Sequence, residues 1–237
     1  MRDAPAVVRT PPTLDVEWGD FWAWFRGEWN QGEHITMVGP TGWGKTTLAI
    51  EILALRRYLV AFAVKGKDKT MEKMIDTLDM ERQQVWTPEV ANRICLWPPI
   101  QGAERDFRLR QRAVFLDAMN RIFRSGAWCT YFDEVSYLSD TLKLDDELKF
   151  FLNQGRSSGI SVVAATQRPA FIPLAFYDMA THLFLWKFND HRNAQRVAEL
   201  TGTAYARVKQ EVMTLPKYQF IYINKDTGLR VRSTVEV

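Results

Sequence analysis

The segment from Gly39 to Thr46, with the sequence GPTGWGKT, decides the fold of this chain. It matches the pattern G-x-x-x-x-G-K-[ST], with Gly39, Gly44, Lys45 and Thr46 in the four fixed positions. Glycines allow the backbone to turn its N–H groups toward phosphate oxygens, and the N-terminus of the helix that follows adds positive charge. The pattern predicts that the chain binds a nucleoside triphosphate.

Two side chains of this loop have a specific role in the prediction. Lys45 is expected to reach the β- and γ-phosphates, and the Thr46 hydroxyl to coordinate Mg²⁺. A glycine-rich turn that binds nothing is the alternative, but an apolar strand before the loop and a helical pattern after it favour the phosphate loop. The residues expected to contact the nucleotide are Gly39, Pro40, Thr41, Gly42, Trp43, Gly44, Lys45, Thr46 and Thr47.

Short apolar runs alternate with helical patterns outward from this loop. The expected strands are residues 34–38, 59–64, 93–97, 128–132, 160–165 and 182–186. The expected helices are residues 46–58, 103–123 and 145–154. Two further runs, 220–224 and 229–235, are joined by KDTG and predict a C-terminal β-hairpin. This order predicts an α/β fold, in which helices cover both faces of a mostly parallel sheet.

Two neighbouring carboxylates, Asp133 and Glu134, follow the expected strand at 128–132. Ligands of open α/β sheets bind at the carboxyl ends of the strands, where these side chains would lie. Asp133 is the predicted metal-side carboxylate, and Glu134 is the predicted general base that polarises the attacking water. An ordinary solvated turn is the alternative, which the upstream phosphate loop disfavours.

Further polar residues flank the expected strand at 160–165. Gln167 follows the strand and is expected to contact the γ-phosphate or the water, although it could simply cap the strand end. Arg156 precedes the strand and follows a helix that we expect on the catalytic side of the sheet. It is expected to complete the site of a neighbouring subunit as an arginine finger, rather than to be an unpaired surface arginine. Arg168 and Arg192 are the next candidates for this role.

Taken together, GPTGWGKT, YFDE and GRSSGISVVAATQRP resemble the motifs of the FtsK–HerA superfamily of DNA-pumping ATPases. The resemblance covers about residues 34 to 190, and the A-T-Q-R-P run is its most specific part. It implies a RecA-like core of the ASCE type that uses ATP and Mg²⁺ and works as a homo-oligomeric ring, a pentamer or hexamer, on double-stranded DNA. It also implies Gln167 as a sensor and Arg156 as the arginine that acts in trans.

In size the chain looks like the small packaging ATPases of double-stranded DNA viruses. It lacks the membrane segments and winged-helix domain of chromosome-segregating members and has no room for the nuclease domain of large terminase subunits. This similarity implies viral genome packaging, a capsid vertex or portal protein as a partner, and a location in the host cytoplasm or with the virion. The alternatives are an assembly or secretion ATPase of the same superfamily and a nucleotide-binding switch of low turnover.

Two basic clusters are candidate contacts for DNA phosphates. Six arginines and only two aspartates lie between residues 105 and 124, which gives this segment more positive charge than the net +3 of the whole chain. On a helix, Arg105, Arg108 and Arg112 share one face, and a solvated helix end is the alternative. The second cluster is expected in a loop after the second strand and consists of Lys65, Lys67, Lys69 and Lys73.

The composition, 46% hydrophobic and 25% charged, is typical of a soluble globular protein. No run of about eighteen uncharged apolar residues is present, so no membrane span is expected. Cys95 and Cys129 are too few for a disulfide framework, and we expect reduced thiols.

The N-terminal segment is rich in aromatic residues, with four of the nine tryptophans between Trp18 and Trp29. We expect a short helix that packs on the core, and stacking on a nucleotide base or a neighbouring subunit is the alternative. The expected division is an aromatic extension at 1–30 and one ATPase domain at 31–237, with the motor core at about 34–190 and a C-terminal helix and hairpin at 190–237.

Overall fold

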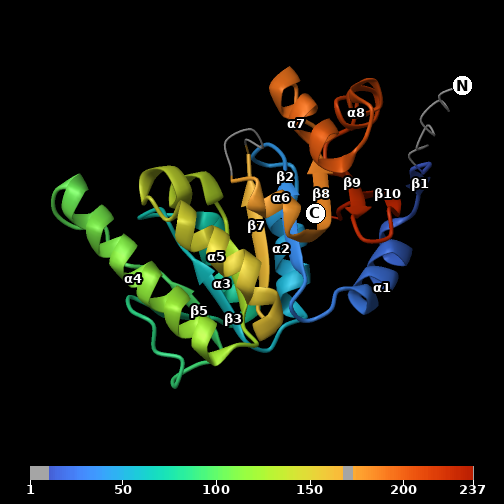
Figure 1. Cartoon of the computed structure of the whole chain (residues 1–237). Coiled ribbons are helices and arrows are strands. Elements are labelled where there is room, and N and C mark those ends of the chain that lie inside the picture. Colours follow the sequence, from blue (N-terminus) through green and yellow to red (C-terminus); the bar gives the residue numbers. More distant parts are fainter. Residues whose placement is uncertain (1–10, 168–172, 237) are drawn as a thin grey trace, which may run out of the picture.

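The computed structural model describes residues 11–167 and 173–236, and its sheet has ten strands (Figure 1). The strands are β1 (Leu14–Asp15), β2 (His34–Val38), β3 (Leu59–Phe62), β4 (Glu81–Gln83), β5 (Arg93–Leu96), β6 (Cys129–Phe132), β7 (Ser161–Thr166), β8 (Ala180–Trp186), β9 (Gln219–Asn224) and β10 (Arg230–Thr234).

The helices of the described residues are α1 (Trp18–Glu28), α2 (Lys45–Ala54), α3 (Lys69–Leu78), α4 (Glu104–Ser125), α5 (Asp145–Gly155), α6 (Ala175–Asp178), α7 (His191–Thr201) and α8 (Tyr205–Val212). A π-helical turn at Tyr137–Thr141 follows β6, and a 3-10 turn at Arg156–Ser158 follows α5.

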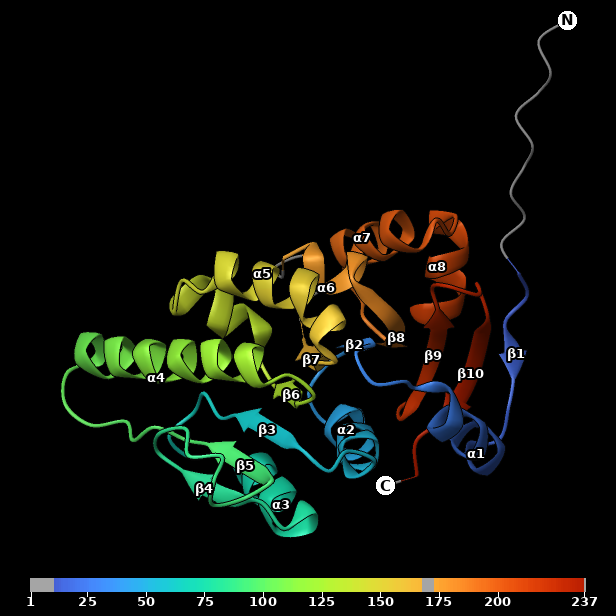
Figure 2. The same cartoon turned by 60° about the horizontal axis from the view of Figure 1, so that its bottom comes forward.

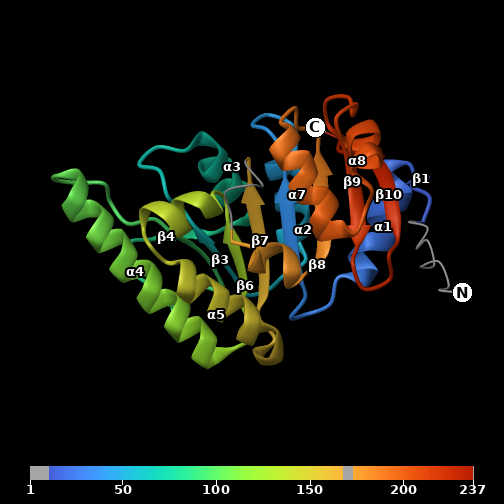
Figure 3. The ribbon, with the colours of Figure 1, turned by 45° about the horizontal axis from the view of Figure 1, so that its top comes forward.

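The strands follow the order β1-β10-β9-β8-β2-β7-β6-β3-β5-β4, and Figure 3 shows them side by side from β4 on the left to β1 on the right. Within the described residues, only β9 runs antiparallel to its neighbours, β8 and β10. All other neighbouring strands pair in parallel. The predicted α/β class with a mostly parallel sheet is therefore confirmed.

Helices cover both faces of the sheet, as Figure 2 shows. On one face α4, α5, α6, α7 and α8 contribute to an apolar cluster that includes Phe115 and Leu148. On the other face α1, α2 and α3 contribute to a second cluster that includes Phe25, Leu48 and Met74. Because strands covered on both faces expose no side to water, β2, β6, β7 and β8 are buried along their whole length.

The chain ends in the predicted β-hairpin of β9 and β10. Its turn, KDTG, ends at Gly228, whose φ of +75° suits glycine and whose N–H donates to the Asn224 carbonyl at 2.9 Å. The short strand β1 pairs with the outer side of β10, so the N-terminal segment extends the same sheet.

The aromatic helix α1 packs on the sheet beside this hairpin. Phe21 and Phe25 are buried, and the Phe21 ring meets those of Phe220 and Tyr222 edge to face at 5.3 and 5.4 Å. Such contacts stabilise a core beyond the area that they bury. The division into an extension and one ATPase domain stays a prediction.

Three local features differ from the expectations. The second lysine cluster does not lie wholly in a loop, because Lys69 begins α3, where Asp68 caps the helix by accepting from the Thr70 and Met71 amides. The edge strand β4 was not expected, since its sequence ERQ has no apolar pattern. Helix α2 ends at Ala54, four residues before the expected end.

No helix in the described residues is long and apolar enough to cross a membrane.

Candidate nucleotide-binding site

A cavity of about 420 Å³ opens at the carboxyl edge of the sheet, above the phosphate loop. The loop follows β2, and the ends of β3, β6 and β7 lie beside it. The residues around the cavity come from the phosphate loop, α2, α3, three strand ends and the loop before β9. They are Thr41, Gly42, Gly44, Lys45, Thr46, Thr47, Ile50, Lys65, Lys69, Thr70, Lys73, Asp133, Gln167 and Tyr218.

Glycines shape the phosphate loop for two different reasons. Gly42 and Gly44 have φ of +76° and +96°, a region that side chains with a Cβ rarely adopt. At Gly39, by contrast, a Cβ atom would lie 2.5 Å from Cβ of Trp186 on the neighbouring strand β8. The loop can therefore lie this close to β8 only with glycine at position 39.

Lys45 lies at the base of the cavity, where its side chain is 9% exposed. Its Nζ donates a hydrogen bond to the Pro40 carbonyl at 2.9 Å, which holds the ammonium group inside the loop. Burial lowers the pKa of Lys45 to about 8, although Asp133 and Glu134 nearby act to raise it. Because few waters hydrate this ammonium group, little hydration is lost when it binds phosphate oxygens.

The two expected metal ligands, Thr46 and Asp133, are linked by a buried tyrosine. The hydroxyl of Tyr131 donates to Oδ1 of Asp133 at 2.8 Å, and it is also hydrogen-bonded to the Thr46 side chain. Burial, together with Asp133, raises the pKa of Tyr131 well above its usual value, so its proton stays available for donation.

This pair of ligands fits Mg²⁺. The ion takes oxygen ligands and keeps several waters, and one or two protein oxygens plus substrate phosphates commonly hold it. No group of three or more His, Cys, Asp or Glu residues in the described part of the chain forms a metal cage. Thr46 and Asp133 would therefore hold the ion together with a bound nucleotide.

Glu134, the expected general base, directly follows Asp133 but does not line the cavity in this structure. Its Oε1 accepts a hydrogen bond from the Ser136 hydroxyl at 2.6 Å. The π-helical turn that follows is connected to α4, because the Tyr137 hydroxyl donates to Gln111 at 2.9 Å. The hydrogen bond from Ser136 orients the Glu134 carboxylate.

Gln167 lies at the cavity, directly after β7, as expected for a residue that contacts the γ-phosphate. Strand β7 is fixed to the phosphate loop, because the Gly39 amide donates to the Thr166 carbonyl at 3.1 Å. Arg168, an alternative arginine finger, lies outside the described residues.

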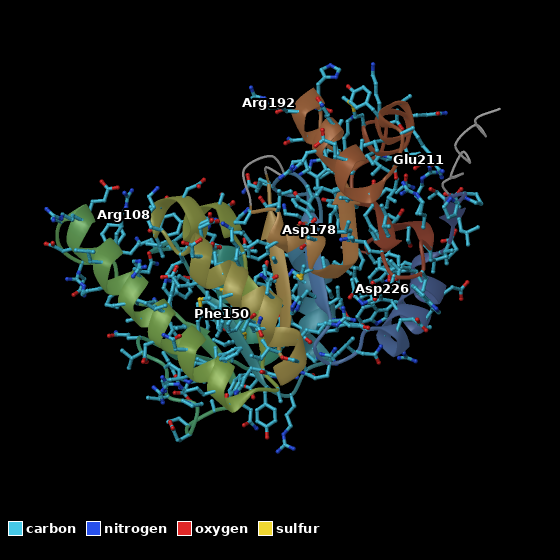
Figure 4. All side chains as sticks on the ribbon, viewed as in Figure 1. Arg108, Phe150, Asp178, Arg192, Glu211 and Asp226 are labelled. Carbon is cyan, nitrogen blue, oxygen red and sulfur yellow. The ribbon has the colours of Figure 1, made fainter. Side chains whose placement is uncertain are left out.

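Arg156 does not lie on the catalytic side of the sheet, and this expectation was wrong. Helix α5 precedes β7, so the arginine stands at the amino edge, where its carbonyl approaches Gly32 just before β2. Its half-exposed side chain pairs with Asp226 at 3.8 Å. From there the guanidinium cannot reach the cavity of its own subunit. Arg192 lies in the first turn of α7, and Figure 4 shows it at the top of the view, above Asp226.

The two basic clusters lie in different places. Lys65 and Lys69 line the nucleotide cavity, whereas Lys67 is exposed and does not. Arg105, Arg108 and Arg112 lie near the start of α4, which projects from the body of the molecule, and Figure 4 labels Arg108 at its tip. Arg108 pairs with Glu104, and Arg112 pairs with Glu147 at 2.7 Å.

Sequence reasoning missed two tyrosines of the site: Tyr131, which is buried and bonded to Asp133, and Tyr218, which lines the cavity. Tyr131 had a usable signal, because it stands two positions before Asp133 on a strand and so points to the same face. Tyr218 had none, since it belongs to the loop before β9, more than 170 residues from the phosphate loop. It lies against Gly44 and has a φ of +70°.

Comparisons with known proteins give a likeness of structure only. No family model matches the chain, and no curated protein matches it. The genome packaging NTPase B204 of Sulfolobus turreted icosahedral virus 2, solved with AMPPCP, is 14% identical. It matches with a TM-score of 0.61 over 88% of this chain and 100% of its own.

Two further solved structures are similar to this chain. VirB4 of Thermoanaerobacter pseudethanolicus is 10% identical, with a TM-score of 0.66 over 86% of this chain and 89% of its own. The pCW3 conjugation coupling protein TcpA is 16% identical, with a TM-score of 0.52 over 86% of this chain and 60% of its own. These matches confirm the RecA-like α/β fold of a P-loop ATPase, and they agree with the resemblance to the FtsK–HerA superfamily at the level of fold.

Proposed function

We propose that this protein is an ATPase that translocates double-stranded DNA and serves in packaging a viral genome. One observation carries the proposal: Lys45, Thr46 and Asp133 converge on one cavity within a fold that a viral genome packaging NTPase shares. The match spans the whole length of that viral protein and 88% of this chain.

The roles in hydrolysis follow from position. Lys45 and the amides of the phosphate loop bind the β- and γ-phosphates, and Thr46 and Asp133 would hold Mg²⁺, which would supply positive charge beside the transferred phosphoryl group. The Glu134 carboxylate gives up its hydrogen bond from Ser136 and accepts a proton from the attacking water. Gln167, at the end of β7, contacts the γ-phosphate or that water.

The motor would work as a ring, a pentamer or hexamer, around DNA. Arg156 lies at the edge of the subunit opposite its own site, which suits a residue that completes the site of a neighbour. The arginines at the tip of α4 would contact the DNA backbone without reading bases. A capsid vertex or portal protein would be the docking partner, in the host cytoplasm or on the virion.

Steady-state ATP hydrolysis with and without double-stranded DNA tests the proposal. The wild-type protein should hydrolyse ATP in the presence of Mg²⁺, and DNA should stimulate the rate strongly. Lys45→Ala should abolish nucleotide binding because it removes the positive charge that contacts the phosphates. Glu134→Gln should bind normally and not turn over, because the amide cannot accept a proton. Normal turnover by Glu134→Gln would show that the base is misassigned.

An assembly or secretion ATPase is the second candidate function. The observation in its favour is that the Type VII secretion ATPase EccC of Thermomonospora curvata shares the fold, with a TM-score of 0.57 over 87% of this chain and 25% of its own. Such an enzyme would hydrolyse ATP at a rate indifferent to DNA. Negligible turnover under all conditions would instead indicate a nucleotide-binding switch.

A further inference from the structure

Lys65 is a second lysine at the nucleotide cavity, and it lies on the far side of Asp133 from the phosphate loop. It follows the end of β3, which is separated from β2 by β7 and β6. Parallel pairing sets Phe62 of β3 beside Phe132 of β6. Three residues further on, Lys65 therefore emerges next to the carboxylates that follow β6.

Both ends of Lys65 are anchored. Its carbonyl accepts a hydrogen bond from the Trp97 indole N–H at 2.7 Å, which fixes the backbone. Its Nζ lies 3.3 Å from Oδ2 of Asp68. The other oxygen of Asp68 is held at 3.0 and 3.2 Å by the Thr70 and Met71 amides at the start of α3. The lysine is thus held in place by a residue that caps a helix.

The ammonium group of Lys65 is nevertheless accessible. Its side chain is 52% exposed, whereas that of Asp68 is 10% exposed. The Nζ also lies 3.9 Å from Oδ2 of Asp133, while Oδ1 accepts the bond from Tyr131. Lys65 therefore stands beside the metal carboxylate with its charge facing the cavity.

The charges around the cavity favour a polyanion. Among the described residues, four lysines, Lys45, Lys65, Lys69 and Lys73, line it together with a single carboxylate, Asp133. Asp133 is the expected metal carboxylate, and in a phosphate-loop site such a carboxylate would lie at the γ-phosphate end of a bound nucleotide. Lys65, beyond Asp133, faces that end, and Lys45 lies on the opposite side of it.

We propose that Lys65 binds the terminal phosphate of a nucleoside triphosphate and makes this site prefer triphosphate to diphosphate. The inference rests on the proposed function of the site as an ATP site. In the structure the ammonium group shares Asp68 and Asp133. With a triphosphate bound, it keeps Asp68 and exchanges Asp133 for a γ-phosphate oxygen, which leaves that carboxylate to the metal.

Lys67 provides a matched control. It lies two residues further along the same loop, is exposed, and does not line the cavity. Methionine is a suitable replacement at both positions, because it keeps most of the aliphatic stem and removes the charge. Lys65→Arg keeps the charge, and thermal melting of each variant checks folding.

The experiment titrates the full-length protein with ATPγS and with ADP, both with Mg²⁺, in a calorimeter. Lys65→Met should weaken ATPγS binding by roughly tenfold, the loss of one charge-assisted hydrogen bond, and ADP binding by less than about twofold. Lys67→Met should change neither affinity, and Lys65→Arg should recover part of the loss for ATPγS.

Three results would overturn the inference. Equal weakening of ATPγS binding and ADP binding would show that Lys65 contacts an inner phosphate. Unchanged affinity for both nucleotides would show that Lys65 does not contact the nucleotide. Loss of DNA affinity without loss of nucleotide affinity would make it a DNA contact. If the wild-type protein bound neither nucleotide, the proposed function itself would fail, so the two failures are distinguishable.

Discussion

The hydroxyl of Tyr131 donates a hydrogen bond to Oδ1 of Asp133 at 2.8 Å, from a ring that is wholly buried beneath the phosphate loop. The same hydroxyl is hydrogen-bonded to Thr46, so a single tyrosine orients both expected ligands of the metal. The bond also occupies one carboxylate oxygen and directs the other toward the cavity. A residue that touches neither nucleotide nor metal thereby positions both ligands.

Tyr131→Phe should therefore weaken the metal site while it keeps the packing of the ring. Removing such an outer partner typically costs 10- to 100-fold in metal affinity, and we expect roughly tenfold more Mg²⁺ for half-maximal ATPγS binding. ADP binding without Mg²⁺ should be unchanged. Tyr222→Phe is the control, since it removes a buried hydroxyl that contacts His182 at 2.8 Å. A Mg²⁺ requirement equal to that of the wild type would show that Tyr131 serves packing alone.

Gly39→Ala should destabilise the protein more than Gly42→Ala does, although both change the same loop. The Cβ at position 39 would meet Trp186 at 2.5 Å, whereas nothing lies within 4 Å at position 42. We expect overpacking at Gly39 to cost about 3 kcal/mol of unfolding free energy, and the positive φ at Gly42 about 1 kcal/mol. Urea denaturation measures both losses of unfolding free energy. Equal losses would contradict the close approach of the phosphate loop to β8.

Stability should fall as the pH drops from about 6.5 toward 4, because of His34. Its Nδ1 accepts from the Val162 amide at 3.1 Å and its Nε2 lies 3.0 Å from the Leu152 carbonyl, so the ring fits only in its neutral form. Burial, and to a smaller extent the charge of Arg156, lowers the pKa of His34 to about 4. The unfolded chain therefore takes up a proton in this window that the folded protein does not.

The expected loss between pH 7 and pH 4.5 is about 2–3 kcal/mol of unfolding free energy, from a pKa shift of this size. Urea denaturation at the two pH values measures it. His34→Asn should be less stable at pH 7 and should lose most of this pH dependence. The same pH dependence in wild type and variant would assign it to other groups, such as His182.

Mixing two inactive variants should restore ATP hydrolysis if Arg156 acts in trans. An Arg156→Ala subunit keeps Glu134, and a neighbouring Glu134→Gln subunit supplies the arginine. The active site at the boundary between these two subunits then has both residues. A trans arginine is worth roughly 10³–10⁵ in turnover in other phosphoryl-transfer enzymes. Mixing Lys45→Ala with Glu134→Gln is the control, because no subunit then has both residues and activity should stay absent. No recovery in mixtures shown to co-assemble would shift the role to Arg168 or Arg192.

The parts of the fold that sequence predicts well are those with a local signal. Apolar runs and the phosphate loop placed the buried strands to within a few residues, because strands covered on both faces must be apolar throughout. The edge strand β4 has no such requirement and was missed. Helix α3 was also missed, although Met71, Met74 and Leu78 recur at helical spacing and Asp68 caps its start.

Contacts between distant segments were beyond sequence reasoning. The position of Lys65 beside Asp133 depends on the pairing of β3 with β6, which no residue near Lys65 encodes. The same holds for Tyr218, which the C-terminal hairpin carries to the phosphate loop. Arg156 is different, because a residue directly before a strand of a parallel sheet lies at the amino edge, so its position could have been read from the order of the elements.

Displacement of a third strand from a DNA triplex tests the central claim most directly, because it requires movement along double-stranded DNA and not binding alone. The wild-type protein should release the labelled third strand with ATP and Mg²⁺ and should not release it with ATPγS. Glu134→Gln should bind ATP and release nothing. Steady ATP hydrolysis by the assembled wild-type protein on the triplex substrate, without release of the third strand, would contradict the account.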